Sequence, residues 1–410
     1  MAETLRVGIA GLGEAATEFI EDFASDPRIK LTAAADTRQA ALDRFREEFG
    51  GQGFKTVSDL AASSDVDVVY VSTPHELHFE HALAVFEHRK HVIVEKPMAL
   101  TVADCQQMIV AADRAGVKLL CGHNHSYDAA IGKMRQIIKS GELGKLCMIN
   151  AWNYNDFMVR PYPDQAIEMS RGVVLNQGPH QIDSVRLLGG GMVRSVRAMA
   201  GRWDPTRPGE GAYLCYLEFE DGVAASLVFN GYGFFDTAEF MDWVGEGGTP
   251  RYADKNVGSR QNYIRLSGDE RTRVIEELKE KMRYGSVRKG EVPDMPPGWE
   301  KGGYRPGESQ AARGQARFGL ILVTCERGDM RQSTHGLWIY GDEKREVLIE
   351  SNRGRRKAEI DELYDGVVNG KPMLHDGRWG MATIEVAEAL LQSSAERREI
   401  ALSHQVPTRD

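Results

Sequence analysis

The chain has 410 residues, of which 42% are hydrophobic and 27% are charged, and its formal net charge is -9 at pH 7. This length exceeds one ordinary hydrophobic core, so we expect two domains, and the negative charge argues against a nucleic-acid partner, which requires a clustered positive field. The sequence contains no run of about 18 apolar residues, which argues against a membrane-spanning helix and a membrane partner.

The first predicted elements form a dinucleotide-binding turn. Residues 5–10 are typical of a strand, and residues 11–16 (GLGEAA) open a helix. In this GxGxxA pattern the first glycine permits the tight turn, the second lets a pyrophosphate approach the backbone, and the alanine lets the helix lie close to the strand. The residues expected to contact the coenzyme here are Gly11, Gly13, Glu14, Ala15 and Ala16.

The second predicted strand indicates which coenzyme is bound. It spans residues 30–35 and ends at Asp36, about 20 residues beyond the glycines, where a carboxylate accepts hydrogen bonds from both ribose hydroxyls. Asp36 would repel a 2′-phosphate, so we expect NAD as the cofactor. Arg38 weakens this preference, because an arginine at this place lies against adenine or meets a phosphate; NADP is the less favoured alternative.

Strands and helices then alternate to residue 121. We predict strands at 66–71, 91–94 and 118–121 and helices at 77–87 and 101–115, the last opened by a Thr101–Asp104 capping box. The alternation predicts a parallel, doubly wound sheet. Polar groups follow three of these strands at residues 72–75, 95–97 and 122–125. In such a sheet these strand ends share one edge, which places the cofactor site there.

Lys96 is the most informative of these polar groups. It follows the β-branched run 92–94, and Pro97 restricts the backbone after it. A lysine is usually only exposed on the surface. The glycine turn and Asp36 in the same half of the chain favour a role in the chemistry instead.

The second half begins with strands expected at 145–155, 192–199, 212–219 and 223–230, the pattern of an antiparallel sheet. A Gly/Pro-rich insertion follows at about residues 241–315, with one helix predicted at 270–283. The stretch from Arg251 to Arg317 holds fifteen Lys and Arg against ten Asp and Glu. Two interpretations stay open: a solvated excursion with a role in oligomerisation, or a basic lid that helps to bind an anionic substrate.

The five cysteines and the amino terminus indicate the cellular compartment. The cysteines are scattered, odd in number and without CxxC spacing, which predicts reduced thiols rather than disulfides or a zinc site. The amino terminus enters a strand directly, without the features of a secretory signal. Both observations predict a cytoplasmic protein.

Four motifs make the chain resemble the glucose–fructose oxidoreductase / inositol dehydrogenase (Gfo/Idh/MocA) family. They are the GxGxxA turn, residues 73–78 (TPHELH, like TPNxxH), Glu95-Lys96-Pro97, and residues 176–183 (NQGPHQID, like DxGxHxxD). The resemblance covers residues 1–235 well and 335–400 loosely. It implies an α/β Rossmann domain with a doubly wound parallel sheet at 1–125. An α+β domain with a large open antiparallel sheet follows at 126–410 and carries the insertion.

The resemblance also implies roles for individual residues. Lys96 would contact the nicotinamide ribose and the reacting oxygen, and His180 would accept the proton. Asn176 stands where the family has an aspartate, and an amide forms hydrogen bonds but gives an imidazolium no charge stabilisation. The further coenzyme residues implied are Asp36, Arg38, Ser72, Thr73, Pro74, His75, His78, Glu95 and Asn124. The expected substrate residues are His123, Tyr127, Trp152, Asn153, Arg171, Gln177 and His180. The family's sheet commonly forms the oligomer interface, so we expect a homodimer or homotetramer.

The histidines have other interpretations. His180 is also placed to cap a helix expected from Pro179 to Leu188, and His123 and His125 also suit a plain loop. A metal site built from His123, His125 and His180 has the right ligand type. No Asp, Glu or Cys spacing supports it, so no metal is expected.

Two further segments sharpen the expected substrate. Residues 318–333 and 374–389 resemble the branch of the family that contains phthalate dihydrodiol dehydrogenases. Arg160 and Arg171 flank the histidine region, and guanidinium groups bind carboxylates through bidentate hydrogen bonds. Aromatisation of such a diol favours hydride loss to NAD. A reaction that is favoured in this way would tolerate Asn176 in place of the family's aspartate.

The expected function is therefore NAD-dependent oxidation of a secondary alcohol on a carboxylated cyclic substrate. Most specifically, it is the oxidation of a phthalate cis-dihydrodiol to the dihydroxyphthalate, with Lys96 stabilising the alkoxide and His180 as base. The alternatives are a sugar or inositol dehydrogenase, an NAD-dependent glycosidase, and a nucleotide sensor without catalysis.

Overall fold

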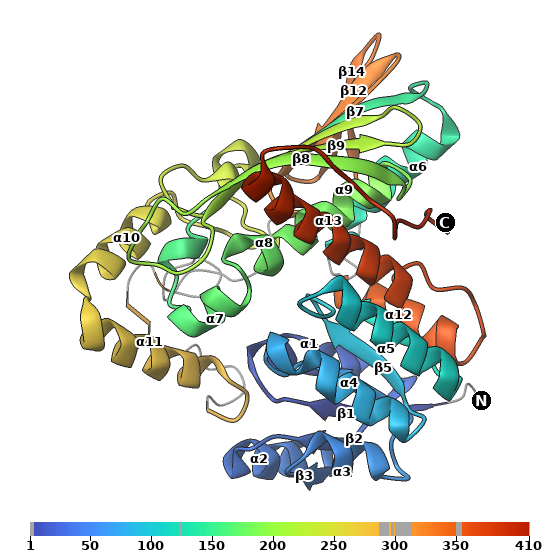
Figure 1. Ribbon diagram of the computed structural model, residues 1–410, viewed down its shortest axis with the longest axis vertical. Coiled ribbons are helices and arrows are strands. Elements are labelled where there is room, and N and C mark those ends of the chain that lie inside the picture. Colours follow the sequence, from blue (N-terminus) through green and yellow to red (C-terminus); the bar gives the residue numbers. More distant parts are fainter. Residues whose placement is uncertain are drawn as a thin grey trace.

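The computed structural model of the protein describes residues 4–122, 125–286, 295–296, 299, 314–349 and 355–409. Its described part contains two β-sheets, each covered by helices (Figure 1). The amino-terminal sheet lies at the bottom of the view, and the second sheet lies at the top.

The amino-terminal sheet has six strands in the order β3-β2-β1-β4-β5-β6. They are β1 (Leu5–Ala10), β2 (Ile29–Ala35), β3 (Gln52–Phe54), β4 (Val68–Val71), β5 (His91–Glu95) and β6 (Leu119–Gly122). Every pair is parallel, which confirms the predicted Rossmann sheet. The strand order reverses between β1 and β4, and the carboxyl ends of the strands there open the crevice in which such sheets bind ligands.

Helices cover both faces of this sheet, and its strands are buried apolar runs. The helices are α1 (Glu14–Ser25), α2 (Gln39–Phe49), α3 (Val57–Ala62), the short 3-10 helix η1 (His75–Leu77), α4 (His78–Glu87) and α5 (Val102–Ala115). The Thr101 side chain accepts a hydrogen bond from the Asp104 backbone N–H, which confirms the predicted start of α5. Helices α2 and α3 were not predicted.

The second sheet has nine strands in the order β14-β13-β12-β11-β7-β10-β9-β8-β15. They are β7 (Leu146–Tyr154), β8 (Val193–Gly201), β9 (Ala212–Phe219), β10 (Ala224–Asn230), β11 (Leu320–Cys325), β12 (Gly328–Gln332), β13 (Gly336–Tyr340), β14 (Lys344–Leu348) and β15 (Ile400–Ala401). One pair corrects the prediction of an antiparallel sheet: β7 and β10 run parallel, so the sheet is mixed. Helices α6 (Ala129–Ser140), α9 (Gly178–Leu188) and α13 (Gly377–Glu396) cover one face of it.

The carboxyl-terminal helices return to the Rossmann domain. Helix α12 (Arg355–Val367) packs against α1, and α13 packs against α5 as well as against β8 (Figure 1). The Cys121 backbone N–H on β6 donates a hydrogen bond to the His375 carbonyl at 2.8 Å. The division into residues 1–125 and 126–410 stays a prediction, because this segment contacts both sheets.

The insertion contains more structure than predicted. The 3-10 helix η3 (Thr237–Met241) precedes it, and the helices α10 (Lys255–Arg265) and α11 (Gly268–Met282) lie within it, where one helix was expected. Helix α10 is polar along most of its length, which explains why apolar periodicity gave no sign of it. Both helices form an arm on the left of Figure 1 that extends from the second sheet toward the Rossmann domain.

Candidate functional site

A cavity of about 750 Å³ lies between the Rossmann strand ends, the second domain and the insertion. Its Rossmann side contains the start of α1 and the residues that follow β4 and β5. The opposite side contains the short α8 (Val173–Asn176), the start of α9, and residues of the insertion. The predicted cofactor edge and the predicted histidine region therefore share one space.

The glycine turn packs closely against the end of β4. Gly11 has φ +89°, and a Cβ there would lie 2.9 Å from the Ser72 carbonyl oxygen. The Ser72 hydroxyl donates a hydrogen bond to the Gly11 carbonyl at 2.8 Å, which joins this turn to the end of β4. Gly13 precedes α1, Ala16 is fully buried, and Glu14 and Ala15 line the cavity. The turn therefore fits a bound dinucleotide.

Asp36 and Arg38 form an ion pair at the end of β2, with 3.2 Å between Arg38 Nε and the Asp36 carboxylate. Asp36 also accepts a hydrogen bond from the Leu12 backbone N–H at 2.8 Å. The Arg38 guanidinium donates further hydrogen bonds to the Leu12 carbonyl at 2.6 Å and to the Tyr284 carbonyl at 3.1 Å. Arg38 is thus held by protein groups on several sides, one of them in the insertion.

Histidines follow β4. The His78 ring is buried, and its nitrogens lie 2.8 Å from the Pro97 carbonyl and 2.9 Å from the Thr73 carbonyl, so it joins the two strand-end loops. His75 lines the cavity, and burial holds its pKa well below the ordinary 6.5. His75 is therefore neutral at pH 7. Pro74 precedes η1.

Lys96 reaches across the cavity to the predicted histidine region. Its Nζ donates a hydrogen bond to the Asn176 backbone carbonyl at 3.1 Å, and burial lowers its pKa from the ordinary 10.5. The preceding Glu95 is buried, where it accepts a hydrogen bond from the Tyr70 hydroxyl at 2.6 Å and pairs with Arg356 at 2.8 Å. Glu95 and Arg356 fix the chain at the base of Lys96.

Asn176 acts through its backbone in this arrangement. Its side-chain Oδ1 accepts a hydrogen bond from Gln177 Nε2 at 2.6 Å, while its carbonyl holds Lys96. Gln177 is also the N-cap of α9, so the interpretation of His180 as the cap is wrong.

His180 lies in the first turn of α9 and lines the cavity beside a second histidine. The His125 and His180 rings are nearly perpendicular, with centroids 4.7 Å apart, and Phe318 packs against both. His125 Nδ1 lies 2.9 Å from the Asp128 carboxylate. A histidine with a carboxylate partner therefore stands next to His180, which the sequence motif alone did not indicate. His123 and Asn124 lie outside the described residues.

Asn153 and Gln177 line the cavity as expected, but three predicted substrate residues do not. Trp152 is 42% exposed on the outer face of β7, because consecutive strand residues point to opposite faces and Asn153 takes the inner one. The Tyr127 hydroxyl donates to Glu362 at 2.8 Å, away from the cavity. The Arg171 side chain is 57% exposed and pairs with Glu210 at 3.3 Å. The structure thus corrects the expected positions of Trp152, Tyr127 and Arg171.

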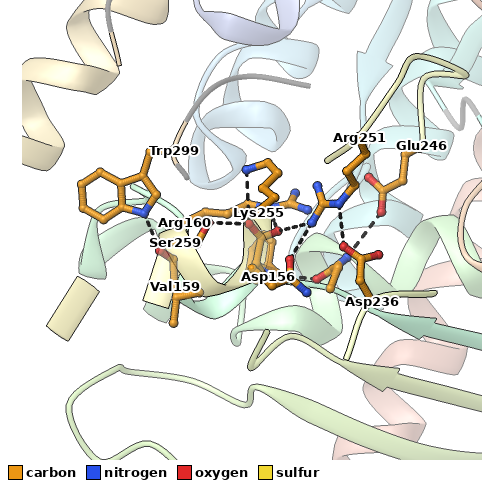
Figure 2. Close-up of polar contacts among 12 residues, drawn as sticks. Asp156, Val159, Arg160, Asp236, Glu246, Arg251, Lys255, Ser259 and Trp299 are labelled. Carbon is orange, nitrogen blue, oxygen red and sulfur yellow. Dashed lines mark hydrogen bonds and ion pairs between the residues drawn. The ribbon is translucent and has the colours of Figure 1, made fainter. Parts of the chain in front are cut away.

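The wall opposite the Rossmann domain is an ion-pair network around Asp156 (Figure 2). The fully buried Asp156 carboxylate accepts hydrogen bonds from Arg160 at 2.8 Å, Arg251 at 3.2 Å, Lys255 at 3.3 Å and Ser259 at 2.7 Å. Three of these partners belong to the insertion. The interpretation of the insertion as a basic element of the substrate site therefore fits better than that of a solvated excursion.

Glu246 lies between this network and the histidines and was not predicted. It accepts hydrogen bonds from the side-chain amides of Asn153 and Asn155, both at 3.4 Å. Burial alone would raise its pKa, but Arg160, His125 and Arg251 outweigh burial and lower it. Glu246 is therefore an anion at neutral pH. An isolated glutamate in a Gly-rich loop carries no sequence pattern that would have revealed it.

The described residues show no sign of a metal site or of a membrane-spanning helix. They contain no group of three or more His, Cys, Asp or Glu side chains arranged to hold a metal ion. None of the helices within the described ranges is long and apolar enough to cross a membrane.

Comparisons with known proteins match both parts of the chain. The family model described as "Oxidoreductase family, NAD-binding Rossmann fold" matches residues 5–123, and the model described as "GFO/IDH/MocA C-terminal domain" matches residues 131–249. The chain is 34% identical to 1-carboxy-3-chloro-3,4-dihydroxycyclohexa-1,5-diene dehydrogenase of Comamonas testosteroni, over 95% of this chain and 94% of that protein. Myo-inositol 2-dehydrogenase of Thermotoga maritima is 29% identical over 47% of this chain and 58% of that protein.

Solved structures agree with these matches. The crystal structure of a candidate dehydrogenase from Bordetella bronchiseptica RB50 is 36% identical, with a TM-score of 0.85 over 97% of this chain and 100% of that chain. The WlbA dehydrogenase of Bordetella pertussis, solved with NADH and UDP-GlcNAcA, is 19% identical with a TM-score of 0.66 over 98% of this chain and 99% of that chain. At that identity the likeness concerns the fold alone.

Proposed function

The chain belongs to the Gfo/Idh/MocA family of oxidoreductases with an NAD-binding Rossmann domain, and from this premise we propose that it oxidises a carboxylated cyclic cis-diol with NAD. The supporting relative from Comamonas testosteroni is named for a substrate that is cyclic, dihydroxylated and carboxylated. The observation that carries the proposal is the cavity itself. It brings Lys96, on the Rossmann side, together with His180 and a wall rich in arginine and lysine on the opposite side.

The proposed mechanism uses few residues. Bound NAD supplies the hydride acceptor. The Lys96 ammonium, held by the Asn176 carbonyl, stabilises the alkoxide that develops on the substrate oxygen, and His180 takes the hydroxyl proton as that alkoxide forms. The substrate carbon loses its hydride and becomes a carbonyl. His125, oriented by Asp128, is placed to hold the proton that leaves His180.

NAD is favoured over NADP because Asp36 lies at the end of β2 with its carboxylate directed to the glycine turn. Arg38 would otherwise favour a 2′-phosphate, but it is paired with Asp36 and held by the Leu12 and Tyr284 carbonyls. A cytoplasmic location, where NAD and reduced thiols are present, belongs to the same proposal, and all five cysteines are free.

The test is a substrate panel with purified protein and either coenzyme. We expect NADH to form fastest with a carboxylated cyclohexadiene cis-diol, the phthalate cis-dihydrodiol being the dicarboxylate member of that class. Myo-inositol, simple sugars and a nitrophenyl glycoside complete the panel. Turnover of inositol or a sugar alone would contradict the proposal, and release of nitrophenol without net NADH would indicate a glycosidase.

We also propose that the outer face of the second sheet joins copies of the chain. Successive register partners on β8, β9, β10, β7 and β11 form an apolar row, whose members are Met199, Leu214, Val228, Trp152 and Leu320. Met199 is 68% exposed and Leu214 is 62% exposed, which is unusual for a contiguous apolar row on a monomer.

We expect Leu214→Asp to reduce the mass of the particle in light scattering. Leu348→Asp is the matched control, because Leu348 is 65% exposed on β14 and lies away from this row. A monomeric wild-type protein, or an equal effect of both variants, would contradict this surface as the interface.

A further inference from the structure

We propose that Arg160 binds the carboxylate of the substrate and that the insertion holds Arg160 in position through Asp156. This inference rests on the proposed function, because it names the group that recognises the acid part of the substrate. Arg160 follows the 3-10 helix η2 (Phe157–Val159) and lines the cavity.

The Arg160 guanidinium uses only part of its hydrogen-bond donors within the described protein. Its Nε donates to Asp156 at 2.8 Å, and its side chain is 21% exposed. Among the residues that the structure describes, neither terminal nitrogen of Arg160 has a hydrogen-bond partner. Two adjacent terminal N–H groups form a planar fork that matches the two oxygens of a carboxylate. Arg160 can therefore bind a carboxylate with its terminal nitrogens while its Nε keeps the hydrogen bond to Asp156.

Other arginines on the same wall are committed to protein groups. Arg251 donates to Asp236 at 2.5 Å, to Asp156 at 3.2 Å and to Asn256 at 2.7 Å. Both terminal nitrogens of Arg317 donate to backbone carbonyls. Among the described arginines that line this wall, Arg160 is thus the one with both terminal nitrogens open.

The backbone beneath Arg160 is fixed by a second arginine. Arg207 is fully buried and donates to the carbonyls of Met158 at 2.8 Å, Arg160 at 2.9 Å and Tyr162 at 2.8 Å. It also pairs with Asp164 at 2.7 Å. Three carbonyls on one guanidinium leave this loop little freedom, so the fork is held before a ligand arrives.

Asp156 fixes the side chain of Arg160 from the other direction. It is held by Arg251, Lys255 and Ser259 of the insertion (Figure 2). Burial alone would raise the Asp156 pKa, but Arg160, Lys255 and Arg251 hold it well below the ordinary 3.8. Asp156 is therefore a fixed anion that orients the Arg160 Nε and leaves its fork facing the cavity. In this arrangement Asp156 is a positioning residue.

The test compares two diols that differ only in the carboxyl group, a carboxylated cyclohexadiene cis-diol and the cis-diol without it. We expect Arg160→Gln to raise KM for the carboxylated diol by about 10- to 100-fold, the range of a lost charge-assisted hydrogen-bond pair, and to leave KM for the other diol unchanged. Arg160→Lys should restore part of the loss, because lysine keeps the charge but not the fork. Asp156→Asn should act in the same direction as Arg160→Gln but less strongly.

The matched control is Arg273→Gln, because Arg273 belongs to the same insertion but is 63% exposed and pairs with Glu277 on α11. Circular dichroism checks that each variant is folded, and NAD affinity is measured by NADH fluorescence. An equal rise in KM for both diols, or weaker NADH binding, would overturn the inference, because Arg160 would then serve the fold or the coenzyme. If the wild-type protein oxidises neither diol, the proposed function fails first, and the two failures are distinguishable.

Discussion

The two walls of the cavity hold their polar groups in different ways. On the Rossmann wall, backbone carbonyls hold the functional side chains, as the Asn176 carbonyl holds Lys96 and the Pro97 and Thr73 carbonyls hold His78. On the opposite wall, charged side chains hold one another around Asp156. Changes on the first wall should therefore alter chemistry more than stability, and changes on the second wall should alter stability as well.

The largest effect is expected from the Rossmann wall. Lys96→Met removes the charge that we propose faces the developing alkoxide, and we expect kcat to fall about 100- to 1,000-fold. The melting temperature should change little, because the described residues give the Lys96 ammonium one hydrogen-bond acceptor, a backbone carbonyl. Rates of NADH formation and thermal unfolding of the same preparation check both parts. More than a tenth of the wild-type kcat in Lys96→Met would contradict the assigned role.

The pH dependence provides a control for the charge of Lys96. Burial lowers the Lys96 pKa from 10.5, so the wild-type enzyme should lose the charged form, and its activity, at a lower alkaline pH than an ordinary lysine would. Lys96→Arg stays charged throughout this range. The alkaline fall in kcat should therefore move upward in that variant, even if its maximum rate is lower.

On the opposite wall, we expect Asp156→Asn to reduce activity less than Lys96→Met does, and to reduce the free energy of unfolding more. Asp156→Asn leaves Arg251 and Lys255 buried without their shared charge partner, and we expect about 3–5 kcal/mol less free energy of unfolding, measured in urea. The folded-state pKa of Asp156 lies below 3.8. Its stabilising effect is thus fully present above pH 3.8 and is lost as the pH falls through the folded-state value. The difference in free energy of unfolding between the wild-type protein and Asp156→Asn should therefore become smaller as the pH falls below 3.8.

A surface pair is the matched control for Asp156→Asn. Asp43 pairs with Arg46 on α2, and both side chains are more than half exposed. We expect Asp43→Asn to change the unfolding midpoint little, because solvent and salt screen exposed pairs. If Asp43→Asn lowered the free energy of unfolding as much as Asp156→Asn, burial would not be the reason for the large effect of Asp156→Asn.

The sequence was most informative where one segment determines its own structure. The predicted strand at 212–219 coincides with β9, and the GxGxxA turn and the polar groups after β4 and β5 share the expected edge. The parallel pairing of β7 with β10 was not predictable in this way, because the residues of a strand do not determine which other strand pairs with it. The roles of Lys96, His180 and Asn176 stay predictions until the variants are measured.

The second wall shows why the substrate residues were harder to predict. Arg160 and Arg171 both lie in loops near the histidine region, and only their partners separate them. Asp156 holds Arg160 at the cavity, whereas Glu210 holds Arg171 at the surface. Trp152 differs from Asn153 by one position, which in a strand selects the opposite face. Such distinctions depend on contacts between segments far apart in the sequence.

The segment that follows α11 in the insertion contacts the predicted coenzyme site. After α11, the Tyr284 hydroxyl donates to Glu48 on α2 at 2.5 Å, Arg44 stacks over the Tyr284 ring at 4.8 Å, and the Tyr284 carbonyl binds Arg38 beside Asp36. One segment therefore touches both Arg38, at the predicted ribose end of the Rossmann site, and the wall of Arg160. Thermodynamic linkage makes any communication through it reciprocal: the factor by which coenzyme changes the affinity for the acid equals the factor by which the acid changes the affinity for coenzyme.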